Sequence, residues 1–272
     1  MGRDGLRMRL FGSPRNRVAV VRIEGIIADS DSLTAGRSKV IASLKAAKRK
    51  GARAVVLRIN SPGGSVAACQ EIFACVTRLV EKGIPVVASM GDVAASGGVY
   101  VSMAATEIVA NPGSVTGSIG VIIRSTDLSH LYDKVGIAPK VIKSGPHKDM
   151  LSTYRSFSKE EESLLQDVIN DSHSQFVEAV TTARRKTQAE VEQIADGRIL
   201  TGRQAYEIGL VDHLGDMDLS VKRASELAGI KGPPRLIHIK IRKGPFQRFF
   251  NYGQTGVGGS LSGIPLWLMA TL

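Results

Sequence analysis

Residues 91–120 read GDVAASGGVYVSMAATEIVANPGSVTGSIG, a stretch that is poor in charge and rich in small residues. The apolar run at residues 85–90 leads into it and predicts a buried strand that ends at a turn. Residues 99–105 then predict a buried helix. Ser96 therefore occupies a strand-to-helix corner, where the unpaired N–H groups at the start of a helix can stabilise an anion. The same pattern also fits a glycine-rich turn in which Ser96 is only the helix N-cap.

A second corner of the same kind precedes this one in the chain. Residues 54–59 predict a buried strand, the sequence NSPGGS follows at residues 60–65, and residues 65–80 predict a helix. Backbone N–H groups in such a turn can point at a ligand. One turn of this kind is an ordinary connection, but two of them, each after an apolar strand, predict α/β layers with a site at the strand ends.

Strand and helix patterns alternate along the rest of the chain. Further strands are expected at residues 18–23, 108–110, 119–123 and 138–142, and further helices at residues 32–50 and 127–134. Capping boxes at Ser158-x-x-Glu161, Thr187-x-x-Glu190 and Thr201-x-x-Gln204 predict one long helix, to about Arg185, and two shorter helices. We divide the chain into a basic segment at 1–17, a domain at 18–228, and a basic, aromatic tail at 229–272. The tail contains a strand-like run at 235–243.

Composition limits the class of protein. The 272-residue chain is 43% hydrophobic and 22% charged, which is typical of a globular protein. Its net charge of +11 favours contact with an anionic surface such as lipid. The basic residues are scattered rather than interleaved with aromatic ones, so we expect no nucleic-acid partner. Cys69 and Cys75 have no histidine pair nearby and predict neither a disulfide framework nor a zinc site.

The common catalytic motifs are absent from the sequence. HExxH, GxxxxGK[ST], GxSxG and GxGxxG do not occur in a usable context, so we expect no metal and no nicotinamide cofactor. A serine nucleophile remains, and it needs a base. Five histidines are candidates by residue type: His130, His147, His173, His213 and His238. A lysine can act instead where burial lowers its pKa, and Lys143 and Lys148 lie in a glycine-containing loop after a predicted strand.

Four motifs in order carry a specific resemblance. They are NSPGGS at residues 60–65, ASGG at 95–98, TGSIG at 116–120 and KSGPHKD at 143–149. Together they resemble signal peptide peptidase A, the protease IV family (peptidase family S49), in its short single-domain form. The resemblance covers about residues 18–228 and implies an α/β fold of the Clp-protease/crotonase type, built from repeated ββα units.

The resemblance also implies a serine endopeptidase with a Ser–Lys dyad. Lys143 fits the lysine motif less well than Lys148 and is the second choice for the base. The roles carried over by motif are Ser96 as nucleophile, Lys148 as general base, Ser118 as the serine that holds the lysine amine, and the N–H groups of Gly63 and Gly97 as oxyanion-hole donors.

The resemblance further implies a homo-oligomer, an octameric dome in short forms, whose neighbouring protomers supply Ser and Lys to a shared site. Its substrates are hydrophobic peptides such as cleaved signal peptides, with damaged or membrane-associated proteins as further candidates. Most members begin with a membrane span, and none is found here. We therefore expect a bacterial or plastid protein that is cytoplasmic or peripherally membrane-associated. The alternatives are a crotonase-like acyl-CoA enzyme and an inactive membrane-associated scaffold.

Overall fold

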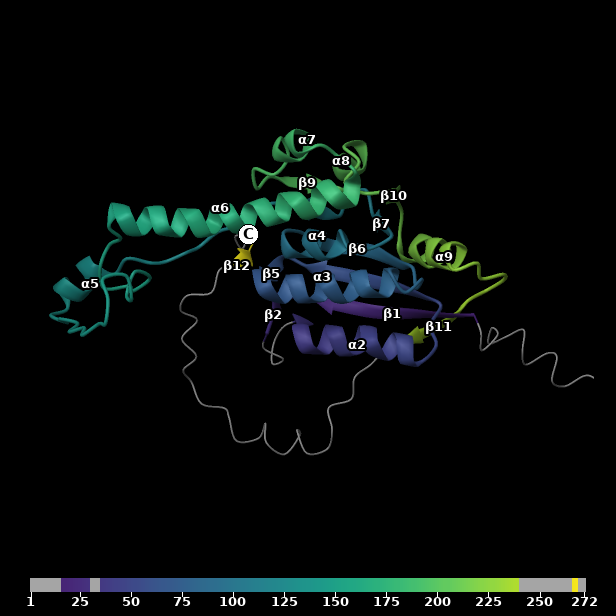
Figure 1. Ribbon diagram of the computed structural model, residues 1–272, viewed down its shortest axis with the longest axis horizontal. Helices are drawn as coiled ribbons and strands as arrows, with labels where there is room; N and C mark the ends of the chain where they lie inside the picture. Colours follow the sequence, from purple (N-terminus) through teal and green to yellow (C-terminus); the bar gives the residue numbers. More distant parts are fainter. Residues whose placement is uncertain (1–15, 30–34, 240–265, 269–272) are drawn as a thin grey trace, which may run out of the picture.

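The computed structural model describes residues 16–29, 35–239 and 266–268 of the chain. Its central sheet is parallel and has the strand order β10-β7-β6-β4-β1-β11 (Figure 1). These strands are β10 (His213–Leu214), β7 (Glu107–Ala110), β6 (Val86–Ala94), β4 (Ala54–Ser61), β1 (Arg17–Glu24) and β11 (Arg235–His238). The short strands β8 (Val115–Gly117) and β9 (Ile199–Thr201) extend it beside β6.

A second, small sheet has the order β12-β5-β2-β3. Its strands are β12 (Leu266–Leu268), β5 (Gly63–Ser65), β2 (Ile27–Ala28) and β3 (Ala35–Gly36). Strand β12, close to the chain's end, runs antiparallel to β5 (Figure 1). The helices are α2 (Arg37–Arg49), α3 (Val66–Val80), α4 (Gly97–Ser102), α5 (Ser129–Lys134), α6 (Lys159–Arg184), α7 (Gln188–Glu192), α8 (Gly202–Glu207) and α9 (Met217–Leu227).

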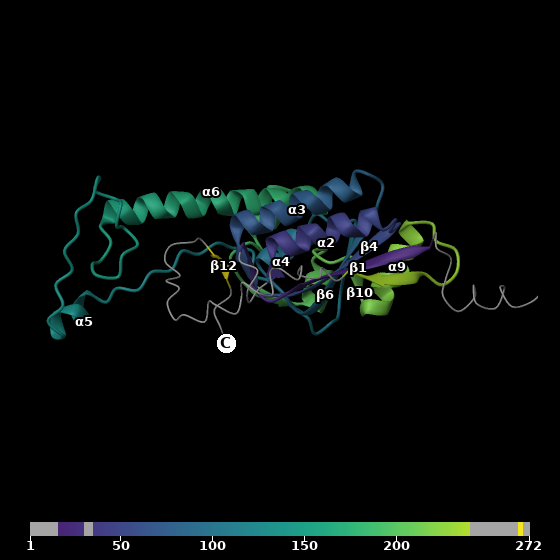
Figure 2. The same ribbon diagram turned by 90° about the horizontal axis from the view of Figure 1, so that it is seen from below.

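Helices cover both faces of the central sheet, as Figure 2 shows from below. Side chains alternate along β4, so that Leu57 packs into the core shared with α2, α3 and α6, while Val56 packs on the opposite face against α9. The inner strands of a parallel sheet are buried on both faces and are therefore continuously apolar. This explains why the runs at residues 54–59 and 85–90 predicted strands correctly. The α/β fold of the Clp-protease/crotonase type is confirmed.

Two of the expected strands do not form. Residues 119–123 contain only an isolated bridge at Ile122, and residues 138–142 contain no strand. Ser118 just before the first run has a φ of 54°, which turns the chain out of the extended conformation. The second run has no neighbouring strand, and its Ile142 is fully exposed. Strand formation needs such a neighbour, because β-propensity is mostly packing.

Helix positions agree more closely with the sequence. All three predicted capping boxes are present, and the long helix α6 extends from Lys159 to Arg184. The helix expected at 32–50 begins only at Arg37, and the helix expected at 99–105 begins two residues earlier, as α4. Helix α9 was not anticipated.

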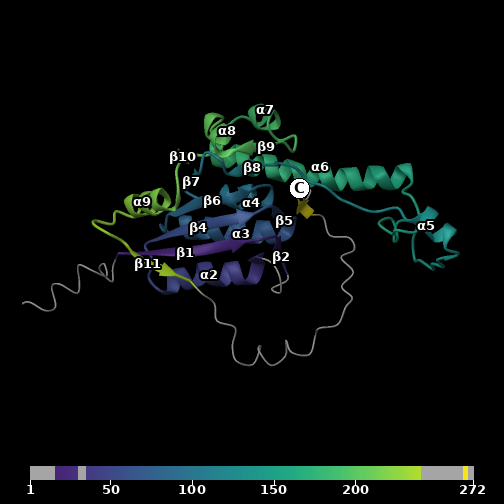
Figure 3. The same ribbon diagram turned by 180° about the vertical axis from the view of Figure 1, so that it is seen from behind.

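Residues 121–158 form an arm that extends beyond the sheet together with the first turns of α6 (Figure 3). Helix α5 lies in this arm. No helix in the described ranges is long and apolar enough to cross a membrane. The domain limits at 18 and 228 stay predictions; β11, beyond residue 228, pairs with β1 of the central sheet. The basic segment at 1–17 and most of the aromatic tail lie outside the described residues.

Candidate active site

The two predicted corners lie side by side at the carboxyl ends of β4 and β6. Ser61 pairs with Ala94, and the Ala95 N–H donates to the Ser61 carbonyl at 3.1 Å. A Cβ atom on Gly97 would lie 2.5 Å from Cys69 Sγ and 3.3 Å from Gly63 Cα. Glycine at 97 therefore permits the close approach of the two turns.

Ser96 has a backbone conformation that is unusual for a residue with a side chain. Its φ is 52° and its ψ is −117°, and the residue is 1% exposed. The Ser96 N–H donates to the Gly117 carbonyl at 2.9 Å, which helps to hold this geometry. Strained backbone persists where the surroundings fix it, and it is concentrated at functional sites. Ser96 is thus a fixed serine at the start of α4, as its place between strand and helix predicted.

Ser118 is held beside Ser96 by two strand pairings. Strand β8 pairs in parallel with β6 and antiparallel with β9. The Ser118 N–H donates to the Arg198 carbonyl at 2.7 Å, and Gly197 N–H donates to the Ile119 carbonyl at 3.1 Å. The segment at residues 197–201 therefore holds in place strand β8, which ends just before Ser118.

Ser96 and Ser118 line one cavity of about 730 Å³. The other lining residues come from the chain after β8, from α6 and from the 195–199 loop: Gly120, Val121, Ile122, Arg124, Gln166, Ile169, Asn170, His173, Ala195, Asp196, Gly197 and Ile199. The mixture of aliphatic side chains with a few polar groups is typical of a ligand pocket. Sequence patterns gave no signal for the α6 residues of this wall, apart from His173 as one of five histidines.

Two polar groups of the cavity already have partners. His173 Nε2 lies 2.7 Å from the Ala195 carbonyl oxygen, which an N–H at that nitrogen would satisfy. Arg198 binds both oxygens of Asp196 and lowers the pKa of that carboxyl to about 2. Asp196 is therefore a carboxylate at neutral pH, paired with Arg198.

The predicted oxyanion donors differ in their surroundings. Gly97 is the first residue of α4, a position whose N–H has no acceptor within its own helix. The Gly63 N–H instead donates to Ser61 Oγ at 3.1 Å. Gly63 has a φ of 119°, which suits glycine, and a Cβ on the next residue, Gly64, would lie 1.8 Å from the Ile27 carbonyl oxygen. The turn is therefore rigidly built beside Ser96, with one of its N–H groups bonded internally.

Neither candidate lysine lines the cavity. Lys148 is exposed on the arm. Lys143 Nζ donates to Asp149 Oδ1 at 2.7 Å and to the Pro146 carbonyl at 2.9 Å, so it belongs to an ion pair within its own loop. The structure thus brings Ser96 and Ser118 together with both glycine turns, and it leaves Lys148 apart from them within one chain.

Both cysteine thiols are enclosed. Cys69 is fully buried, and burial raises the pKa of its thiol to about 12. The pKa of Cys75 is also raised, chiefly by burial. A thiol is inert when it is buried and protonated. Within the described ranges, no three His, Cys, Asp or Glu side chains are grouped so that they could hold a metal ion.

Comparison with known proteins identifies the family to which the chain belongs. The model of peptidase family S49 matches residues 78–231, more than half of the chain, and the Clp protease model matches residues 18–114. "Putative protease slr0021" of Synechocystis sp. is 46% identical over 80% of this chain and 76% of its own length. Protease 4 of Salmonella typhi is 36% identical over 79% of this chain, and the chloroplastic serine protease SPPA of Arabidopsis thaliana is 33% identical over 79%. This chain spans only 35% and 33% of those two longer relatives. The chain therefore belongs to peptidase family S49.

Proposed function

We propose that the protein is a serine endopeptidase in which Ser96 attacks the carbonyl carbon of a peptide bond. The observation that carries this proposal is the setting of Ser96: a buried serine with positive φ, at the end of β6, in a cavity and against the Gly63–Gly64 turn. A serine hydroxyl is a weak nucleophile and needs a base that takes its proton. The names of the protease relatives agree with this chemistry.

In the proposed reaction, neutral Lys148 accepts the proton of Ser96 Oγ as the serine attacks. The N–H groups of Gly97 and Gly63 stabilise the tetrahedral oxyanion, and one such donor contributes about 3 kcal/mol. The bond to Ser61 Oγ must open when the Gly63 N–H turns to this task. The lysine then gives its proton to the leaving amine, and a water molecule hydrolyses the acyl ester, returning a proton to Ser96 Oγ. Ser118, on the cavity wall, holds the lysine amine in place.

Lys148 reaches Ser96 from a neighbouring copy in this proposal. Support comes from the arm, where Lys148 is exposed and outside the cavity lining of its own chain. The arm and the first half of α6 also carry aliphatic side chains exposed by 39–103%: Ile122, Leu131, Val135, Ile137, Val141, Ile142, Leu164 and Val168. Apolar surface of this extent is typical of an interface. We expect a closed ring, with the octameric dome of the short family members as its form.

Extended apolar peptides are the substrate class that fits the site. Strand β12 pairs antiparallel with β5 from Leu266 to Leu268, so the edge of β5 next to the glycine turn accepts an extended segment. A substrate that displaces β12 from this edge gains the same kind of main-chain hydrogen bonds. The aliphatic wall formed by Val121, Ile169 and Ile199 then favours apolar side chains. Cleaved signal peptides have this character, as do unfolded segments of damaged or membrane-associated proteins.

Contact with a membrane surface belongs to the same proposal. The net charge of +11 favours binding to anionic lipid, and this binding would bring the enzyme close to its substrates in a bacterium or a plastid. The purified protein should pellet with anionic vesicles at low salt and not with neutral ones. Failure to pellet with either would remove the peripheral membrane role and leave the peptidase chemistry untouched.

The decisive experiment compares single variants on a fluorogenic peptide with an apolar residue before the scissile bond. Ser96→Ala should abolish cleavage and Lys148→Ala should reduce it to a small residual rate, while the oligomer persists, because each removes one partner of the dyad. Lys143→Ala should stay active, since Lys143 serves an ion pair. His173→Gln tests the histidine in the cavity, and it should keep most of the activity. Loss of activity in His173→Gln with an active Lys148→Ala would replace the Ser–Lys dyad by a Ser–His pair.

A parallel assay of the same preparation with an acyl-CoA thioester separates the two rival functions. An acyl-CoA enzyme would turn over an acyl-CoA thioester and leave the peptide intact, and an inactive scaffold would assemble without turning over either. Membership of peptidase family S49 favours the peptidase.

A further inference from the structure

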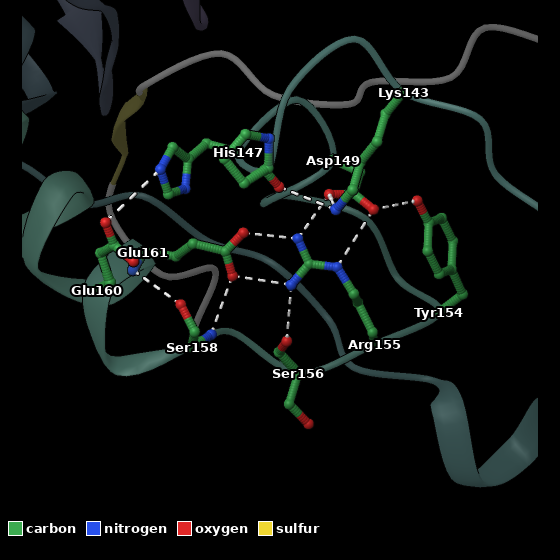
Figure 4. Close-up of polar contacts among 10 residues, drawn as sticks. Lys143, His147, Asp149, Tyr154, Arg155, Ser156, Ser158, Glu160 and Glu161 are labelled. Carbon is green, nitrogen blue, oxygen red and sulfur yellow. Dashed lines mark hydrogen bonds and ion pairs between the residues drawn. The ribbon is translucent and has the colours of Figure 1, made fainter.

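Arg155 links the segment that carries Lys148 to the start of α6. Figure 4 shows Arg155 between two carboxylates. Its Nε and Nη2 donate to Asp149 at 3.2 and 2.6 Å, and its Nη1 and Nη2 donate to Glu161 at 2.8 and 2.6 Å. Two paired contacts of this kind use the planar fork of a guanidinium, which a lysine amine cannot reproduce.

Both carboxylates are almost enclosed. The side chains of Asp149 and Glu161 are 11% and 4% exposed, and that of Arg155 is 30% exposed. Hydrogen bonds from Arg155 are the largest cause that lowers the pKa of Asp149 far below its usual range and that of Glu161 to about 2. The carboxylates are therefore charged at any physiological pH. A charged group this enclosed needs its partner, so removing Arg155 would leave Glu161 without a cation and Asp149 with Lys143 alone.

One end of this cluster is rigid. Glu161 is the third residue of α6, where its side chain also accepts the Ser158 N–H at 2.9 Å as part of the capping box. The cap fixes the carboxylate relative to the helix axis. Helix α6 in turn packs Phe176 and Val180 into the main core. Arg155 thus connects the loop at residues 143–149 to helix α6, which is itself packed into the core.

The residues on either side of Lys148 in the sequence both take part in these contacts. Asp149 follows Lys148 directly. Its carboxylate accepts a hydrogen bond from Tyr154 Oη at 2.8 Å, in addition to those from Arg155 and Lys143. His147 precedes Lys148, and its Nε2 lies 3.8 Å from Glu160 Oε1 in the first turn of α6 (Figure 4). The loop has no helix or strand of its own between residues 143 and 149. The contacts of Asp149 and His147, through Arg155 and Glu160, therefore orient the backbone at Lys148 relative to the first turn of α6.

We propose that Arg155 is a positioning residue for Lys148, bridging Asp149 to Glu161 so that the lysine amine is presented at a fixed place. This inference rests on the proposed role of Lys148 as general base. A lysine amine that acts as base across a subunit boundary must be held in a fixed position relative to the serine, because a displacement of about 1 Å can cost about 100-fold in rate. The guanidinium fork supplies that fixed position, because it binds Asp149 and Glu161 at the same time.

The test uses Arg155→Lys in the full-length, assembled protein, with Arg22→Lys as the matched control. Arg22 makes one exposed ion pair with Glu24 far from the arm, so its conservative replacement should be silent. Arg155→Lys keeps the charge but loses the fork. We expect kcat to fall about 10- to 100-fold with KM within about twofold, and the oligomer to keep its mass.

A second readout separates positioning from general support of the fold. Arg155→Lys added to Lys148→Ala should lower the residual rate no further, because a residue that acts through Lys148 has nothing left to aim.

Three results would overturn the inference. They are an unchanged kcat in Arg155→Lys, a fall in rate that accompanies loss of the oligomer, and an equal further loss in the Lys148→Ala background. If Lys148→Ala itself is fully active, the proposed dyad fails along with the inference. If Lys148→Ala is inactive and Arg155→Lys is normal, only the positioning role fails.

Discussion

At the residue scale, the site is defined by backbone positions that tolerate few side chains. Ser96 and Ser118 both have positive φ, which costs a residue with a side chain of order 1–3 kcal/mol. The glycines at 64 and 97 stand where a Cβ would meet the Ile27 carbonyl or Cys69 Sγ. The strained serines and the crowded glycines together keep the two turns in contact.

Gly97→Ala tests this contact. The added Cβ would overlap Cys69 Sγ and press on Gly63, so the turns must separate. We expect a loss of about 1–3 kcal/mol in the free energy of unfolding and a larger loss in cleavage rate. Urea denaturation and the peptide assay measure the two effects.

Gly113→Ala is the matched control for that variant. It adds the same methyl group in a turn where nothing lies within 4 Å. Wild-type stability together with wild-type activity in Gly97→Ala would show that the close approach has no role.

Residue patterns reached only part of the site. Ser96 and the glycine turns were visible because small residues directly after apolar strands predict corners. The glycine-containing loop offered Lys143 and Lys148 alike, and only the family resemblance favoured Lys148. Arg155 was missed, because one arginine in a polar loop resembles any solvated cation, and its two carboxylates, Asp149 and Glu161, come together only in the folded chain.

At the scale of elements, local signals were reliable where the element stabilises itself. The capping box at Ser158 and Glu161 predicted the start of α6 correctly, since its bonds are made within four residues. The expected strands at 119–123 and 138–142 failed because a strand depends on a neighbour that the local sequence does not specify. Helix α9 was missed although it has a local signal, since Asp216 caps its start by accepting the N–H groups of Asp218 and Leu219. Its packing against β4 and β6 is not visible in its own sequence.

The first turn of α6 should give the protein a characteristic acid sensitivity. Arg155 lowers the pKa of Glu161 from 4.5 to about 2 in the folded state. Because the folded-state pKa is the lower one, this stabilisation is complete above about pH 5 and is lost as the pH falls toward 2.

Glu161→Gln should therefore be less stable than wild type at pH 7 and should approach it as the pH falls from 5 to 3. Urea unfolding at several pH values measures the difference. Glu162→Gln, one residue further along the exposed face of the same turn, is the control and should follow the wild-type curve. A Glu161→Gln curve parallel to wild type across this range would contradict the assigned cause.

At the scale of the whole molecule, one chain keeps Lys148 apart from its two serines and carries exposed aliphatic side chains on a long arm. The cavity holds both serines, while Lys148 is exposed on a segment that extends past the sheet (Figure 3). Ile142, at the arm's surface, is fully exposed. A second copy that covers the arm would bury these aliphatic side chains and bring a lysine to each cavity.

Ile142→Glu should shift the assembly toward smaller species, because a charge would be buried in the new interface. Cleavage should fall in parallel with the loss of the oligomer, measured by light scattering at the assay concentration. Tyr206→Glu places the same charge on an exposed surface of α8, outside the arm, and should change neither property. An Ile142→Glu monomer with full activity would show that each chain is complete.

The shared dyad is tested most directly by mixing two inactive variants. Ser96→Ala and Lys148→Ala subunits are co-expressed in equal amounts, and the mixed oligomers are purified through a tag on each. If Ser96 of one copy works with Lys148 of the next, about a quarter of the sites in a random closed ring are intact, and cleavage should return to about that fraction of wild type. Mixed oligomers that stay as inactive as either variant alone would contradict the account, because a dyad within one chain cannot be restored by a neighbour.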